Sequence, residues 1–118
     1  MAAGALFVGW GPAVTGREQK ALQVFNEAVA YYGRLQQAGT ISGFEPFLLQ
    51  PHGGDLGGFL LLRGDLEALA RLLVEEEFVR LNGRAQLVVT NFGVVLAHTG
   101  EDLQRLFAEF GRNAAELA

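Results

Sequence analysis

An apolar side chain recurs at every third or fourth position through residues 15–39, and this pattern restricts the fold more than any other part of the chain. The spacing predicts a helix of about 24 residues, roughly 35 Å long, with one apolar stripe that needs a partner layer. Thr15 and Glu18 form a capping box at the expected start, and Gly39 is the glycine on which the helix would end. We therefore expect one long helix to lie across a sheet.

Strand-like runs flank this helix on both sides. Residues 4–11 are a short apolar run bounded by glycines, and residues 41–50 form a second run in which Pro46 indicates an edge strand. A glycine-rich turn at 51–58 then leads to a third apolar run at 59–63. A strand, a helix and a hairpin of two strands make up most of a split β-α-β unit.

The second half of the chain continues with a helix, a strand and a further helix. Asp65 is the expected cap of a second helix, which the acidic triplet at 75–77 interrupts and the Asn-Gly pair at 82–83 ends. Residues 85–97 have the composition of a long fourth strand, and a last amphipathic helix is expected from Thr99. These elements complete the order β-α-β-β-α-β with an added C-terminal helix.

This order predicts a single α+β domain over residues 1–118, a ferredoxin-like sandwich with its first and third strands at the centre of the sheet. Both crossover helices would cover one face. The third and fourth strands are apolar on both faces, so the second face also requires a cover. We expect a second copy of the chain to provide it, in a homodimer that pairs through Phe7, Phe59, Leu61, Val88 and Phe92.

The strand pattern, together with the segments GFLLLRGD at 58–65 and EEFVRLN at 76–82, resembles small bacterial proteins of the dimeric α+β barrel superfamily. That group includes YCII-like proteins, antibiotic-biosynthesis-type monooxygenases and muconolactone isomerases, as well as many uncharacterised members. The resemblance covers nearly the whole chain. It implies that two sheets pair into a barrel, and because activities differ within the group it implies no particular reaction.

Composition removes several functional classes. Thirteen acidic and nine basic residues give a net charge of −4, which argues against binding to a nucleic-acid backbone. The absence of cysteine removes thiolate nucleophiles and cysteine-based metal sites. The uncharged stretches are interrupted by glycine, proline or polar residues and fall short of a membrane span, so we expect a cytoplasmic protein with no membrane partner.

Residues 11–18 have the glycine spacing of a phosphate-binding loop but not its chemistry. Arg17 and Glu18 stand where a lysine and a magnesium-binding hydroxyl are needed, and Pro12 removes one backbone amide from the cradle. A carboxylate at this position would repel phosphate. We expect no nucleotide site here.

Two histidines are each followed by a carboxylate. His52 precedes Asp55 in the glycine-rich turn, and this pair is the weak candidate for a general base with its orienting acid. The alternative is that His52 is a solvated loop residue. His98 precedes Glu101 and Asp102 at a helix start, where a surface histidine beside the helix N-terminus is the simpler interpretation.

A pocket is expected near the end of the first strand. Trp10 lies there, and Tyr32, His52 and Asn91 are the other candidate ligand-binding residues for a small apolar molecule. We expect no metal and no cofactor. The first functional hypothesis is a small-molecule-binding or cofactor-free enzymatic dimer, and the alternative is a non-catalytic structural or interaction module. A pocket with a polar group inside would favour the first, and a solid core the second.

Overall fold

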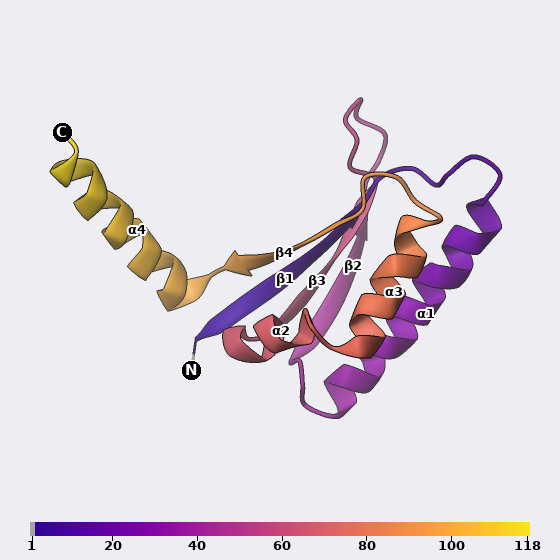
Figure 1. The fold of residues 1–118 in the computed structure, drawn as a ribbon, viewed down its shortest axis with the longest axis horizontal. Helices are drawn as coiled ribbons and strands as arrows, with labels where there is room; N and C mark the ends of the chain where they lie inside the picture. Colours follow the sequence, from indigo (N-terminus) through magenta and orange to yellow (C-terminus); the bar gives the residue numbers. More distant parts are fainter. Residues whose placement is uncertain (1) are drawn as a thin grey trace.

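A computed structural model describes residues 2–118, and its elements follow the predicted order. They are β1 (Ala3–Trp10), α1 (Glu18–Gln37), β2 (Gly43–Leu48), β3 (Gly58–Asp65), α2 (Leu66–Leu72), α3 (Glu76–Gln86), β4 (Gly93–His98) and α4 (Gly100–Glu116). The strands form one antiparallel sheet in the order β2-β3-β1-β4, with the first and third strands at its centre. Figure 1 shows α1 and α3 side by side on one face, and α4 leaving the sheet on the side away from them. The ferredoxin-like α+β fold class is confirmed.

The core lies between the sheet and helices α1 and α3. The register pairs Leu6 with Leu62 and Val8 with Leu60, so alternate side chains of the two central strands point at the helices. All four side chains are buried, and Phe78 of α3 packs with them in the same cluster. Complete burial of such side chains contributes about 1.5–3 kcal/mol each, and this cluster therefore fixes the helices on the sheet.

Several of the predicted helix boundaries are confirmed. The Asp65 side chain caps α2 by accepting a hydrogen bond from the Ala68 backbone N–H at 3.3 Å. The acidic triplet separates α2 from α3, and Gly39 follows α1 with a φ of 80°, a left-handed conformation that glycine adopts without strain.

The capping box at Thr15 is wrong. Helix α1 begins at Glu18, and within residues 2–118 no side chain caps it. The Glu18 carboxylate instead accepts a hydrogen bond from the backbone N–H of Gly16, 3.3 Å away, in a turn where Gly16 has a φ of 87°. The left-handed turn at Gly16 redirects the chain, so Thr15 lies outside the helix.

The fourth strand is also shorter than predicted. Helix α3 continues through Gly83 to Gln86, and β4 begins only at Gly93. Glycine inside a helix costs roughly 1 kcal/mol relative to alanine, less than the gain from burying Leu81 and Val88, which are 8% and 5% exposed. Val88 therefore belongs to the core rather than to a sheet surface, which corrects its predicted place in the homodimer face.

Three of the five residues predicted for the homodimer face do lie on the sheet surface that α1 and α3 leave uncovered. Phe7, Phe59 and Leu61 alternate with the core residues of β1 and β3 and are all half-buried. Phe92 does not lie on this surface, because it precedes β4 and packs against the core from the other side. We call the surface formed by Phe7, Phe47, Phe59, Leu61 and Val95 the open face.

No helix within residues 2–118 combines the length and the apolar character that a bilayer crossing requires.

Candidate functional site

An apolar cavity of about 690 Å³ lies between the sheet and helices α1 and α3. Ala21 and Ala28 on α1 and Ala85 on α3 face it. These three helix positions carry only a methyl group, whereas the opposite end of the same layer is filled by Tyr31 and Phe78. The small side chains at these three positions leave space between the helices and the sheet.

At the end of β1, the cavity is bounded by the segment between β1 and α1 and by the segment between α3 and β4. The Gly11 N–H donates to the Thr90 carbonyl at 2.7 Å, and the Val14 N–H donates to the Val88 carbonyl at 2.8 Å. A Cβ atom on Gly11 would lie 2.8 Å from the Asp55 carbonyl oxygen and 2.9 Å from the Thr90 hydroxyl. Only glycine permits this close approach, so Gly11 allows the β2–β3 loop and the segment before β4 to pack against the end of β1.

The two predicted aromatic residues both line this cavity. Trp10 of β1 meets the ring of Phe25 edge-on, with 5.8 Å between the ring centroids. Tyr32 of α1 is 1% exposed and lies against Phe44 and Phe78, with centroid separations of 5.9 and 6.5 Å. Burial raises the pKa of the Tyr32 hydroxyl well above its usual value, so the group stays protonated at all physiological pH values.

The Tyr32 hydroxyl supplies polarity to an otherwise apolar wall. Within residues 2–118 no side-chain hydrogen bond engages it, and no fully buried polar side-chain atom is left without a partner. Tyr32 lines the cavity, and its hydroxyl is the group of this residue that could donate or accept a hydrogen bond with a bound molecule. Glu18 and Asn82 add polar groups at the margins of the cavity.

The other two predicted ligand-binding residues lie outside the residues that line the cavity. His52 is exposed in the β2–β3 loop, and Asn91 is exposed in the turn before β4, with a φ of 53°. The His52 ring serves its own loop, because Nδ1 accepts the Gly54 N–H at 3.2 Å and Nε2 lies 2.8 Å from the Leu56 carbonyl. No hydrogen bond or ion pair joins His52 to Asp55 in the described part of the chain.

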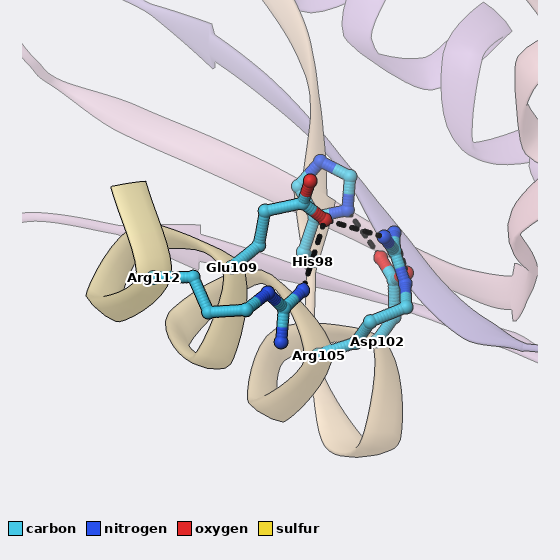
Figure 2. A network of polar contacts seen from close by, with 5 residues as sticks. All are labelled: His98, Asp102, Arg105, Glu109 and Arg112. Carbon is cyan, nitrogen blue, oxygen red and sulfur yellow. Dashed lines mark hydrogen bonds and ion pairs between the residues drawn. The ribbon is translucent and has the colours of Figure 1, made fainter. Parts of the chain in front are cut away.

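The second histidine belongs to a polar network at the junction of β4 and α4. Figure 2 shows His98, Asp102, Arg105, Glu109 and Arg112 together along the start of α4. The Asp102 carboxylate accepts hydrogen bonds from His98 Nδ1 and, at 2.8 Å, from Arg105 Nη2. These two partners, Arg105 foremost, lower the pKa of Asp102 and shield it from water at the surface. The network ties the first turn of α4 to the end of β4.

The open face carries a row of stacked aromatic rings. Phe47 lies on Phe59 with ring centroids 4.7 Å apart, and Phe59 lies on Phe7 at 5.0 Å. The Phe7 ring also covers Gly9, where a Cβ atom would stand 2.5 Å from it. Val95 extends the same surface onto β4 and is 57% exposed. Glu45 lies opposite Leu61 in the register and places a charged side chain beside this apolar row. An apolar surface with a charged border is typical of a protein–protein contact.

Sequence reasoning missed the alanines that create the cavity. Ala21 and Ala28 are seven positions apart and therefore share one side of α1, which is a detectable signal for a thin place in the helix layer. Ala85 was missed for a different reason, because the residue was assigned to a strand and its helical face was not considered.

No protein-family model and no curated protein sequence matches this chain significantly. Solved structures do match. A dimeric protein of unknown function with a ferredoxin-like fold from Bacteroides fragilis gives a TM-score of 0.61 at 14% identity, over 84% of this chain and 98% of the other. A dimeric ferredoxin-like protein of unknown function from Jannaschia sp. gives 0.63 at 13% identity, over 84% and 99%.

The third similar structure is that of an enzyme. SnoaB, a cofactor-independent oxygenase from Streptomyces nogalater, gives a TM-score of 0.56 at 20% identity, over 85% of this chain and 96% of its own. Identities this low establish a shared fold and no shared activity. The chain has a ferredoxin-like fold.

Proposed function

We propose that this protein binds a small, largely apolar molecule in the cavity between the sheet and helices α1 and α3. The volume of about 690 Å³ carries this proposal, because small-molecule sites span roughly 300–1,000 Å³ whereas protein cores are otherwise close-packed. Most of the lining side chains are aliphatic or aromatic. A purely structural module is expected to have a close-packed core, whereas this core contains a cavity.

The polar groups around the cavity define the class of ligand. The Tyr32 hydroxyl offers one donor or acceptor, and the Trp10 indole N–H offers one donor. Glu18 is the single charged residue among the described lining residues and is itself exposed at the margin. A neutral ligand with an apolar body and one or two oxygen atoms fits this distribution, because a buried charge would find no counter-ion.

Binding is better supported than catalysis. Glu18 and Tyr32 are the ionisable side chains among the described lining residues, and burial keeps Tyr32 protonated. His52 and Asp55, the predicted general base and its acid, lie in a loop and do not line the cavity. The similarity to a cofactor-independent oxygenase is one of fold and assigns no reaction.

The sole tryptophan of the chain provides the test. Because Trp10 lines the cavity, energy transfer from it to the neutral fluorophore N-phenyl-1-naphthylamine reports occupancy directly. We expect saturable transfer with a dissociation constant of about 10 μM or lower. Ala21→Phe, which fills the cavity from α1, should weaken binding by about tenfold or more. Ala30→Phe, on the exposed side of α1, is the matched control and should leave the titration unchanged. Non-saturable transfer, or equal effects of the two substitutions, would exclude the cavity as the binding site.

We also propose that two copies of the chain pair through the open face. The stacked row of Phe47, Phe59 and Phe7 supports this, as does the description of two structural neighbours as dimeric. Four strands at about 4.8 Å spacing and some 23 Å of length give a face of roughly 450 Å². A second copy is the simplest cover, because a twofold axis lets one self-complementary surface bury itself.

A further inference from the structure

Helix α4 carries an apolar stripe that this chain leaves largely uncovered. The stripe occupies about 100° of the helix surface and consists of Leu103, Leu106, Phe107, Phe110 and Leu117. Leu103 and Leu106, next to the sheet, are half-buried. Farther along the helix, Phe107 is 67% exposed, Phe110 73% and Leu117 87%. Two phenylalanines this exposed on one helix face indicate a surface that is incomplete in the single chain.

The position of α4 explains why its own chain does not cover the stripe. Figure 1 shows the helix projecting from the end of β4 toward the C-terminus, away from α1 and α3. The radius of gyration is 16.4 Å, whereas a compact chain of this length would have about 13.5 Å. The main contacts that α4 makes with another element of the chain are those with β1. The projecting helix accounts for the extended shape.

The opposite side of α4 holds the helix in this direction. Asp102 joins His98 of β4 to Arg105, and Glu109 lies 3.8 Å from both Arg105 and Arg112. Charged residues thus occupy one side of the helix, and the apolar stripe occupies another. A helix that was only a disordered tail would not separate its side chains in this way or anchor its first turn to a strand.

We propose that α4 is an arm that packs its apolar stripe against a second copy of this chain, beside the contact between the two open faces. This rests on the open-face pairing proposed above. The area supports it, because a stable interface buries roughly 800 Å² per partner and the open face supplies only about 450 Å². A stripe about 25 Å long and 10 Å wide adds about 250 Å². The arm brings the contact close to the size that a lasting dimer needs.

Continuity between the two surfaces also favours a second copy over any other partner. Val95 lies on the open face and is only eight residues before Leu103, where the stripe begins. A partner seated on the open face is therefore adjacent to the base of the arm. By twofold symmetry each chain would give one arm and receive one.

The oligomeric state of the full-length chain tests this proposal. Sedimentation velocity over a range of concentrations should show a dimer for the unaltered protein. Phe107→Glu combined with Phe110→Glu should raise the dimer dissociation constant by about 100-fold or more, because two charges would enter an apolar contact. The matched control is Gln104→Glu combined with Ala108→Glu, which places the same charges on exposed positions of α4 away from the stripe and should leave the dimer intact. Far-UV circular dichroism shows whether each variant stays folded.

A photo-crosslink locates the arm. Replacing Phe110 by p-benzoylphenylalanine and mixing light with ¹⁵N-labelled chains should yield, on irradiation, covalent dimers that join peptides of different isotopic mass. Crosslinks confined to one chain would overturn the proposal, since α4 would then fold back on its own sheet. An unaltered protein that sediments as a monomer would overturn it as well. If Leu61→Lys dissociates the dimer but the Phe107 and Phe110 substitutions do not, the arm is refuted while the open-face pairing stands. Loss of fluorophore binding alone would count against the cavity and leave the arm unaffected.

Discussion

Replacing Ala28 by leucine should stabilise this protein while filling part of the cavity proposed as its binding site. Ala28 is 9% exposed, lies in the middle of α1 and faces the cavity of about 690 Å³. The substitution adds three carbon atoms, which at about 0.8 kcal/mol for each buried methylene would contribute up to about 2.4 kcal/mol. Fixing the leucine rotamer costs about 0.5–1 kcal/mol, and the two residues differ little in helix propensity. We expect a net gain of roughly 1.5 kcal/mol.

Urea unfolding at one fixed protein concentration measures this gain, because the stability of a dimer depends on concentration. Ala30→Leu, on the exposed side of the same helix, should change the unfolding free energy by less than about 0.5 kcal/mol. The fluorophore titration should show weaker binding for Ala28→Leu only. A loss of about 1–3 kcal/mol on substitution of Ala28 would refute the reasoning, since it is the result expected when a leucine is forced into a closely packed core. Stabilisation with unchanged binding would place the fluorophore elsewhere.

Three further predictions concern Gly11 beside the cavity, the open face and the ion pair between Glu27 and Arg84. Gly11→Ala should lower the unfolding free energy by about 1–3 kcal/mol, because its methyl group would meet backbone only 2.8 Å away, and an unchanged urea midpoint would contradict this. Leu61→Lys should dissociate the dimer into folded monomers, whereas Val88→Lys should unfold the chain because Val88 is 5% exposed; sedimentation with circular dichroism separates the two results. Glu27 accepts two hydrogen bonds from Arg84 at 2.8 and 2.9 Å, which lower its pKa below 4.5. With both side chains well exposed, Glu27→Gln should cost up to about 1 kcal/mol at neutral pH. That difference should shrink and then vanish as the pH falls through the lowered pKa of Glu27, because protonation of Glu27 removes the pair from the unaltered protein as well; a difference that persists once the carboxyl groups are protonated would refute this.

The order of elements could be predicted from local signals because each one acts within a few residues. The Asp65 side chain needs only the nearby amide of Ala68 to begin a helix. Gly39 needs only its own left-handed φ to end one. Glu75 and its two acidic neighbours break the apolar stripe between α2 and α3. Such signals are present in the unfolded chain and survive folding unchanged.

The boundaries that failed depend on contacts between distant segments. Asn82 and Gly83 are a sound local signal for the end of a helix, yet α3 continues to Gln86. Burial of Leu81 and Val88 against residues far away in the sequence outweighs the local preference. The cavity also depends on contacts between distant segments, because its lining includes residues of β1, α1, β2, α3 and the segment before β4. The position of His52 depends on local contacts instead, because both nitrogens of its ring lie within hydrogen-bond distance of backbone groups in its own loop.

The shorter fourth strand links the cavity to the arm. Had residues 85–92 continued the sheet, Val88 and Phe92 would have enlarged the open face and Ala85 would not line a cavity. In the structure all three line the cavity, and the sheet surface is smaller by the same segment. A face of roughly 450 Å² falls short of a standard interface, so a dimer built on it needs additional apolar surface. Helix α4 follows the shortened strand directly and carries Phe107 and Phe110 exposed on one side. The rearrangement that places Ala85, Val88 and Phe92 around the cavity also reduces the sheet surface, so the proposed pairing depends on the arm as well as on the open face.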